Sequence, residues 1–448
     1  MTLRPRLPIT SAALALIAAT ALAPRAQASG FSLREQSPSA LGSAFAGVSA
    51  GGTDISAMFW NPAAMSLYGN QFILGSSLII PSAEIANAKA MPAPMFPQTP
   101  FAGPGASPNS VNPVPLPAIY GTWGVSEDFR LGLSINVPYG MVVQYNQDFV
   151  GRYHALRTSL KTVDVSPNFS YRVTPEWSVG GAFIARMVKA ELTNYVDFGA
   201  IGQALGLPGY APGNHDAVAA LEGDKWVYGF KVGTIVQPVP ELRLGLAYSG
   251  KTTVDLNNGK VKYTGVPAAF ASKFVDGGAG VALDLPDTVS AGLHWDLTKE
   301  FAVQGEIAKT SWSKFKELRV KFASGQADSV VDESWKDTTY FSVGGVWKYN
   351  NELTLRFGYA HDQAPMDDFH RTPRVPDGDR NWFSVGTSYA FSKQLSVDFA
   401  LTHIQVKDGT INLQSGTTPA DPNFFRGTLT GTFKNKVDIV AIQARYNW

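Results

Sequence analysis

The six histidines are the side chains best suited to acid–base or metal chemistry, and they stand at positions 154, 215, 294, 361, 370 and 403. A hydrolase needs a nucleophile with a base within reach, and a helical zinc site needs a spacing such as H-E-x-x-H. Neither pattern surrounds these histidines. The sequence therefore favours a protein that is not an enzyme, and it predicts no catalytic residue, no metal site and no cofactor.

A second group of side chains is suited to binding apolar molecules. Two long connections, residues 198–224 and 257–284, carry large apolar groups in otherwise polar surroundings. Exposed apolar side chains on loops usually mark a binding surface or a liability, and they can also pack two loops against each other. The residues concerned are Phe198, Ile201, Leu205, Leu207 and Tyr210 in the first connection and Val266, Phe270, Phe274 and Val281 in the second.

The composition indicates which kind of scaffold must hold these groups. The chain has 43 Gly, 26 Phe, 16 Tyr and 10 Trp but no Cys, so no disulfide framework can stabilise it. Charged residues make up 16%, below the ~25% usual in soluble domains, and the net charge of +1 gives no reason to expect nucleic acid. A mean hydropathy near zero fits a membrane β-barrel, in which lipid-facing and lumen-facing residues alternate.

The first 28 residues have the pattern of a secretory signal peptide. Arg4 and Arg6 form the basic start, residues 11–23 the apolar stretch, and residues 26–28 the small-residue cleavage site, so that the mature chain begins at Ser29. The apolar stretch is shorter than the ~20 residues of a membrane-spanning helix. We therefore expect an exported protein without a transmembrane helix.

The rest of the chain shows the alternation of β-strands. Leu131, Leu133 and Ile135 alternate with small or polar residues, and the same pattern recurs near 242–249, 353–360 and 395–402. Tight polar turns precede these segments, whereas much longer connections follow them. Short turns at one end and long loops at the other are typical of outer-membrane barrels, with the short turns on the periplasmic side.

We count fourteen strands, an even number as single-chain bacterial barrels require. Several exceed the ~10 residues that cross a bilayer, so the wall should extend beyond the membrane. The last strand ends in Tyr446 and Trp448, which resembles the C-terminal signature read by the barrel assembly machinery. A secreted β-sandwich also alternates, but it seldom needs so many strands. The strands are expected near 71–85, 115–125, 128–140, 157–174, 176–197, 225–238, 241–256, 285–298, 299–322, 333–350, 351–363, 380–391, 394–414 and 427–448.

Residues 29–70 do not alternate and are unlike barrel wall. They contain too many large apolar groups, among them Phe45, Phe59 and Trp60, for a disordered tail. Irregular backbone at membrane depth is tolerated only inside protein or beside a cavity. The predicted organisation is thus a signal peptide (1–28), an N-terminal hatch that plugs the lumen (29–70) and an all-β transmembrane antiparallel barrel (71–448).

Several short motifs, in their order and spacing, resemble the FadL family of outer-membrane long-chain fatty-acid transporters, which includes aromatic-hydrocarbon uptake proteins. The resemblance covers essentially the whole mature chain. It is carried by Ser29-Gly30-Phe31, Asn61-Pro62-Ala63, Thr310-Ser311-Trp312-Ser313 with Phe315, Trp335-Lys336-Asp337, Pro376-Asp377 with Asp379-Arg380 and Trp382, and Tyr389-Ala390-Phe391 followed by residues 404–412.

The resemblance implies passive transport. Ligand would be captured in a groove between the connections 198–224 and 257–284, through Phe198, Leu205, Phe270 and Phe274. It would then pass to a deeper site that includes Phe31. The nearest matches for a group that binds the ligand's carboxylate are Arg186 and Lys189, which could equally be lumen charges paired with Asp or Glu.

The family's own basic positions fall on Asn194 and Val331 in this chain. Their replacement by uncharged residues leaves an uncharged aromatic or aliphatic hydrocarbon as an alternative ligand.

The family's lateral exit is a kink in the third strand, and here it falls on Pro138, Tyr139 and Gly140. Pro lacks a ladder N–H and Gly weakens a strand, although the same residues could simply end the strand at a loop. In the family the triplet matched by Asn61, Pro62 and Ala63 sits against this strand, and hatch movement opens the route. The triplet could also merely shape the plug.

Other classes remain as alternatives. A general porin should lack an apolar hatch and should conduct ions, whereas a receptor or adhesin could use the same barrel. The expected setting is the bacterial outer membrane and its lipid, with a hydrophobic small molecule as partner. The resemblance favours a monomer.

Overall fold

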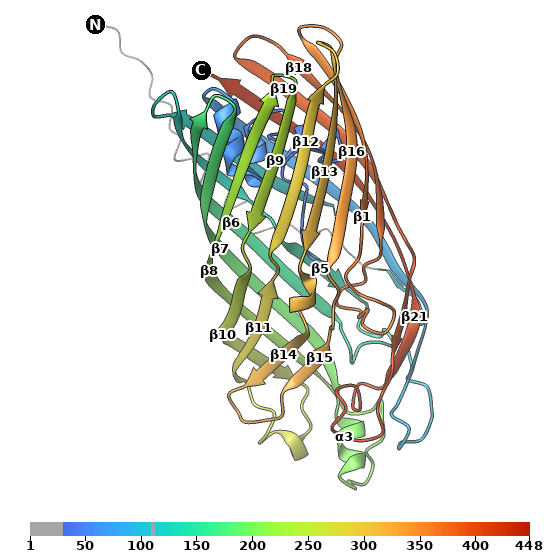
Figure 1. The fold of residues 1–448 in the computed structure, drawn as a ribbon. Coiled ribbons are helices and arrows are strands. Elements are labelled where there is room, and N and C mark those ends of the chain that lie inside the picture. Colours follow the sequence, from blue (N-terminus) through green and yellow to red (C-terminus); the bar gives the residue numbers. More distant parts are fainter. Residues whose placement is uncertain (1–29, 109–112) are drawn as a thin grey trace, which may run out of the picture.

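A computed structural model describes residues 30–108 and 113–448. The predicted signal peptide, residues 1–28, lies outside the described residues. The remainder forms one closed antiparallel barrel (Figure 1). Closure is made by β1 (Gln71–Met91), which pairs with β3 (Val114–Gly124) on one side and with the C-terminal β21 (Thr428–Asn447) on the other. No helix among these residues is long and apolar enough to cross a membrane.

The barrel has fourteen strands, as predicted, and several of them are interrupted, so that one strand of the wall comprises two elements. A short extra segment, β2 (Ser107–Pro108), extends the edge beside β1. After β1 and β3 the wall consists of β4 (Phe129–Asn136) with β5 (Gly140–Gln144), β6 (Arg157–Thr174), β7 (Trp177–Asp197), β8 (Asp216–Val239), β9 (Leu242–Ser249) with β10 (Thr252–Thr264), β11 (Gly277–Leu285) with β12 (Thr288–Asp296), β13 (Phe301–Thr310) with β14 (Glu317–Phe322), β15 (Ser329–Asp332) with β16 (Thr338–Lys348), β17 (Leu353–Asp362), β18 (Arg380–Ala390), β19 (Leu395–Val406) with β20 (Gly409–Leu413), and β21.

The two connections between β7 and β11 are shorter than the sequence analysis predicts. β8 begins at Asp216 and β10 continues to Thr264, inside the segments expected to be loops. Their ends are rich in Ala, Gly and Lys and therefore show little alternation, yet ladder hydrogen bonds with neighbouring strands hold them extended. The parts of the two connections that are not strand include the short helices α3 (Phe198–Ala204) and η3 (Ala268–Phe270).

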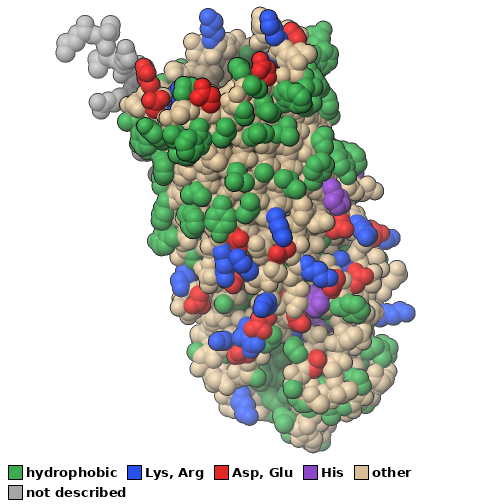
Figure 2. Space-filling model, viewed as in Figure 1, with side chains coloured by type: hydrophobic (Ala, Val, Ile, Leu, Met, Phe, Trp, Pro, Cys, Tyr) green, Lys and Arg blue, Asp and Glu red, His purple; other side chains and the backbone are tan. Residues whose placement is uncertain are grey.

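The outer surface of the barrel is divided into an apolar and a charged half. On the face shown in Figure 2, green apolar side chains form a band over the half nearer the short turns; Lys, Arg, Asp and Glu lie at the rim beyond this band and over the other half. Exposed aromatic groups of the apolar half include Trp123, Trp177 and Trp347, in agreement with the aromatic girdles of membrane barrels. The charged half has the composition of a surface in water, so the wall extends beyond the membrane.

Residues 30–70, the N-terminal segment, fold inside the end of the barrel that carries the short turns (Figure 1, blue). They form α2 (Pro38–Leu41), η1 (Ile55–Phe59) and η2 (Pro62–Leu67) and are mostly buried. Wall glycines permit this packing. A Cβ on Gly344 would lie 2.9 Å from the Ser43 oxygen, and one on Gly386 would lie 2.7 Å from Gly42 Cα. Glycine in a strand often marks such close backbone approach, which explains part of the high glycine content.

Polar contacts tie this segment to the wall at several points. The buried Tyr340 and Tyr120 hydroxyls donate to the carbonyl oxygens of Ala44 and Gln36, at 2.6 and 2.7 Å. The Ser49 amide donates to Glu306 at 3.0 Å. Because buried polar groups are costly when unpaired, these bonds fix the segment in one position.

Candidate ligand-binding site and lateral opening

The third strand of the wall is interrupted at residues 137–139. β4 pairs with both β3 and β6, whereas β5 pairs with β6 alone. Among the described residues, the part of β3 from Val114 to Ala118 therefore has no strand partner on that side. This stretch contains Pro115 and Pro117, and prolines are confined to edge positions in sheets. The two prolines are a sequence signal for the gap that the analysis above missed.

The N-terminal segment takes the place of the missing strand partner. The amide of Leu33 donates to the Pro138 carbonyl at 2.8 Å, and the amide of Gly140 donates to the Phe31 carbonyl at 3.0 Å. Between these bonds, Ser32 stands opposite Tyr139 as an antiparallel pair. Residues 31–33 thus pair with the interrupted strand as a short strand would.

The side chain of Gln36 completes this seal. Its Nε2 donates to the Val137 carbonyl at 2.7 Å, and its Oε1 accepts from the Val137 amide at 3.0 Å. A side-chain amide here satisfies a backbone donor and acceptor that a neighbouring strand would otherwise satisfy. Withdrawal of the segment would leave the backbone groups of residues 137–140 unpaired on this side.

The start of the N-terminal segment also contacts the connection between β17 and β18. The Gly30 amide donates to Asp377 Oδ2 at 2.8 Å, and Arg380 Nε donates to Asp377 Oδ1 at 3.0 Å. Asp377 belongs to the connection between β17 and β18, so a loop between distant strands and the N-terminal segment share one buried carboxylate.

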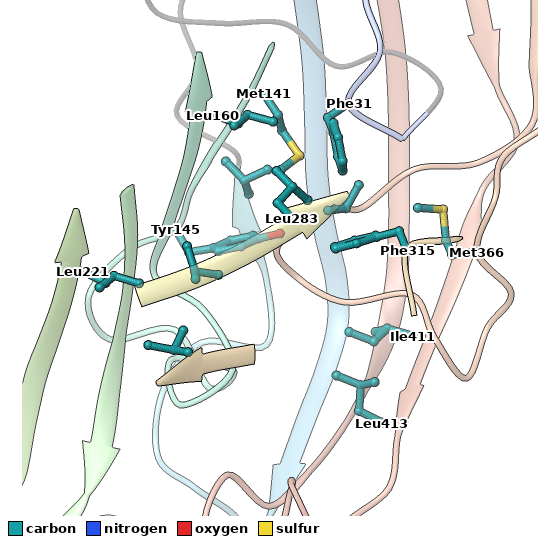
Figure 3. Close-up of a cluster of buried hydrophobic side chains, with 14 of the residues drawn as sticks. Phe31, Met141, Tyr145, Leu160, Leu221, Leu283, Phe315, Met366, Ile411 and Leu413 are labelled. Atoms are coloured by element: carbon teal, nitrogen blue, oxygen red, sulfur yellow. The ribbon is translucent and has the colours of Figure 1, made fainter. Parts of the chain in front are cut away.

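Phe31 is the centre of an aromatic cluster, and it is 3% exposed. Its ring centroid lies 4.7 Å from that of Trp312, 5.6 Å from Trp335, 5.9 Å from Phe315 and 6.2 Å from Tyr139. Figure 3 shows Phe31 and Phe315 among apolar side chains such as Met141, Leu283 and Ile411, which come from several different strands and connections. Three of the short motifs in the sequence therefore meet at this cluster.

A cavity of about 340 Å³ lies at the end of the barrel that carries the long connections, between these connections and the wall. Its lining is mostly apolar and includes Leu192, Leu221, Val320 and Phe322. Two arginines, Arg374 and Arg426, also line it. The volume is within the ~300–1,000 Å³ typical of small-molecule pockets.

Neither arginine forms an ion pair with a carboxylate of the described residues. Arg374 is 6% exposed and donates to Thr158 Oγ1 at 3.2 Å and to Asn194 Oδ1 at 3.1 Å, while its Nε has no hydrogen-bond partner. Arg426 donates to the Val330 carbonyl and to Ser329 Oγ. Burial and the neighbouring Arg426 lower the pKa of Arg374 to about 10, and burial lowers the pKa of Arg426 to about 10.

Two further ionisable groups adjoin these arginines. Burial raises the pKa of Glu333 to about 8, and the Glu333 carboxyl accepts from Trp335 Nε1 at 3.0 Å. Burial, together with Arg426 and Arg374, lowers the pKa of His154 to about 3. At neutral pH both groups are therefore mainly uncharged. Asp197 and Asp328 also line the cavity and Asp421 lies near Arg426, but none of the three forms an ion pair with either arginine.

Asn194 and Val331, the family's basic positions, line this cavity with Arg374 and Arg426. The positive charges thus come from other places in the chain than the resemblance suggests. Both arginines lie in irregular connections, where no periodicity marks them, so the sequence analysis missed them. A resemblance that compares position with position cannot detect a charge moved to another segment.

Arg186 and Lys189 do not lie together. Arg186 is 4% exposed and binds Asp164 through two bonds, of 2.7 and 2.8 Å. Lys189 is exposed on the outer face of β7. Successive side chains of a strand alternate between faces, so residues three apart cannot both face the lumen. We therefore correct the expectation for Lys189 and do not retain it as a ligand group.

The apolar loop residues pack mainly against each other. Phe198 and Phe270 are 0% and 5% exposed, and their ring centroids are 4.9 Å apart. Phe274 packs on Phe198 and also lines the cavity. Leu205 is 66% exposed. The contacts thus correspond to the alternative in which the loops pack together, with part of the same cluster facing the cavity.

The triplet Asn61-Pro62-Ala63 lies against β7 and β8. Asn61 Nδ2 donates to the carbonyls of Ser49 and Thr234, at 2.7 and 3.1 Å, and its Oδ1 accepts from the Ala63 amide at 3.0 Å. Pro62 and Ala63 pack on Gly180 of β7. Residues 31–36 pair with residues 137–140 of the interrupted strand, whereas η2, which begins with Pro62 and Ala63, contacts β4 as well as β6, β7 and β8.

Comparison with known proteins gives the family. Residues 19–448 match the outer membrane protein transport protein family (OMPP1/FadL/TodX). The "Long-chain fatty acid transport protein" of Escherichia coli O6:H1 (strain CFT073) is 26% identical over 397 residues, which cover 83% of this chain and 85% of that protein. The "47 kDa outer membrane protein" of Pasteurella multocida (strain Pm70) is 30% identical over 389 residues, which cover 83% of this chain and 85% of that protein.

Solved structures share the fold. The crystal structure of a Pseudomonas aeruginosa FadL homologue has a TM-score of 0.82 at 23% identity and covers 93% of this chain and 99% of that chain. The Pseudomonas putida toluene transporter TodX has a TM-score of 0.68 at 18% identity and covers 94% and 100%. With the family match spanning nearly the whole chain, the protein belongs to the OMPP1/FadL/TodX family of outer-membrane transport proteins.

Proposed function

We propose that this protein carries long-chain fatty acids passively across the outer membrane. The observation that supports this choice is the mostly apolar cavity lined by the buried Arg374 and the partly buried Arg426, neither of which forms an ion pair with a carboxylate of the described residues. Relatives named as long-chain fatty acid transport proteins support the same substrate class.

Electrostatics favour a carboxylate over an uncharged ligand. A buried charge without a partner is costly, and removal of such a charge is often neutral or stabilising. A cavity for hydrocarbons alone gains nothing from Arg374 and Arg426, whereas the carboxylate of a fatty acid can accept charge-assisted hydrogen bonds from both. The apolar lining then contacts the hydrocarbon chain.

The proposed route continues from this cavity to the break in the wall. A ligand moving inward meets the Phe31 cluster, whose displacement would pull on residues 31–33 and their bonds to Pro138 and Gly140. Release of these bonds opens the unpaired stretch of β3 to the lipid. The ligand then leaves sideways into the membrane, down its concentration gradient, and no energy source is needed.

Uptake of uncharged aromatic hydrocarbons is the second candidate. The aromatic cluster of Phe31, Trp312 and Trp335 favours it, because aromatic rings interact well with one another in offset or edge-to-face arrangements.

The test is uptake by cells that express the protein but lack any transporter of their own for these compounds. We expect labelled oleate to enter faster than in cells carrying the empty vector. Uptake of toluene without oleate would favour the second candidate. Conductance of small ions by the purified protein, without uptake of either compound, would instead favour a general porin.

A further inference from the structure

A second and smaller cavity, of about 80 Å³, lies between the N-terminal segment and the interrupted strand. Arg34 lines it from the segment, Pro138 and Tyr139 from the interruption, and Arg186 and Lys231 from the wall. It shares no lining residue with the larger cavity. Phe31 packs against Tyr139, which lines the small cavity.

Three positive side chains face this small cavity, and only one of them is neutralised. Arg186 has its ion pair with Asp164. The Arg34 guanidinium lies 3.7 Å from the ring centroid of Tyr340, and the Lys231 ammonium lies 3.8 Å from that of Phe59. Neither has an ion pair with a carboxylate in the described part of the chain.

The nearby acids do not line this cavity. Glu306 is engaged with Ser49 of the N-terminal segment. Glu35, which is buried next to Arg34 in the chain, has no hydrogen-bond partner for either oxygen. The charged side chains that line the small cavity are thus all positive, directly beside the break in the wall.

We propose that this cavity is a second carboxylate site, in which Lys231 and Arg34 hold the headgroup of an anionic amphiphile during its exit. This inference rests on the proposed function. A carboxylate released by Arg374 and Arg426 would otherwise cross the apolar interior unpaired, at a high cost. The cavity can hold a headgroup but not a long chain, so the hydrocarbon tail must lie elsewhere, with the unpaired stretch of β3 beside it.

A purely structural role for Lys231 predicts a different behaviour. Lys231 Nζ donates to the Phe59 carbonyl and so anchors the N-terminal segment. Loss of this anchor should affect all ligands equally. Loss of a carboxylate site should affect only ligands that carry the charge.

The experiment compares Lys231→Met and Arg34→Gln with the wild-type chain, using labelled oleate and its uncharged analogue oleyl alcohol. We expect oleate uptake to fall roughly tenfold, as for one lost charge-assisted interaction, and oleyl alcohol uptake to stay unchanged. Lys231→Arg should keep oleate uptake. Lys189→Met is the matched control, because it removes a lysine from the outer face of the neighbouring strand.

Binding of oleate to the purified full chain separates this site from the larger cavity. The affinity should be unchanged in Lys231→Met, since Arg374 and Arg426 remain. An equal fall in uptake of both compounds, or no fall at all, would overturn the inference. Failure of the wild-type chain to take up oleate would refute the proposed function itself.

Discussion

Replacement of Arg374 by methionine should weaken fatty-acid binding without weakening the fold. Burial and Arg426 lower the pKa of Arg374 from 12.5 to about 10. This corresponds to a cost of about 3 kcal/mol for keeping the guanidinium charged without ligand. Methionine removes that cost, while Asn194 and Thr158 lose one hydrogen bond each, at about 1 kcal/mol per bond. The two effects nearly cancel, so the ligand-free variant should unfold at the wild-type temperature or slightly above it.

The loss of binding should depend on the charge of the ligand. A hydrogen bond to a charged group contributes about 1.5–3 kcal/mol, and 1.4 kcal/mol is a factor of ten in affinity. Oleate should therefore bind Arg374→Met roughly 10- to 100-fold more weakly, whereas oleyl alcohol should bind as before.

Titration of the purified proteins with each compound measures both affinities. Arg157→Met is the matched control, because Arg157 already has an ion pair with Glu191. The reasoning is refuted if the ratio of oleate to oleyl alcohol affinity is the same in Arg374→Met as in the wild type, or if the ligand-free variant is strongly destabilised.

Three other predictions follow from the same contacts. Burial raises the pKa of Glu333 from 4.5 to about 8, so the stability that its neutral form contributes is fully present below pH 4.5 and is lost as the pH rises through about 8. Oleate affinity should fall over the same rise, because the new Glu333 anion competes for Arg374. Glu333→Gln should make the oleate affinity nearly independent of pH in this range. Phe31→Ala removes the centre of the aromatic cluster, at a cost of about 3–5 kcal/mol. It should therefore loosen the N-terminal segment and raise ion conductance in planar bilayers. Unchanged conductance would contradict a sealing role of this segment. Gly344→Val should displace the segment at Ser43 and raise proteolysis of residues 30–70. Gly277→Val, whose Cβ would lie 3.9 Å from its nearest neighbour, the Val275 oxygen, should not.

The alternation of residues such as Leu131 and Leu133 was enough to predict the strands, because an antiparallel wall between lipid and lumen enforces a period of two along each strand. The apolar content of residues 29–70 likewise predicted a buried segment, since such groups do not remain in water. The extra strand residues near Asp216 and Thr264 were missed because ladder hydrogen bonds formed by Ala, Gly and Lys leave no periodic signal.

The positions of charges in the lumen were harder to predict. The sequence alone could have excluded Lys189 as a lumen group beside Arg186, because residues an odd number of positions apart on a strand lie on opposite faces. Arg374 and Arg426 lie in connections that fold back over the cavity, and only the tertiary fold brings them close to Asn194. The hydrogen bonds between Gln36 and Val137 could not be predicted either, because nothing in the local sequence marks a side chain that takes over the hydrogen bonds of a neighbouring strand.

A reversible disulfide between the N-terminal segment and the interrupted strand tests the account most directly. Ser32 and Tyr139 face each other as an antiparallel pair flanked by the bonds Leu33–Pro138 and Gly140–Phe31. Side chains of such non-hydrogen-bonded pairs are close and can meet disulfide geometry. The chain has no cysteine of its own, so Ser32→Cys with Tyr139→Cys forms a single possible bond.

Oleate uptake is then measured with the bond oxidised and reduced in the same cells. We predict that oxidation stops uptake, that reduction restores it, and that oleate still binds the oxidised purified protein. Equal uptake in the oxidised and reduced states would contradict an exit through the break that this segment seals.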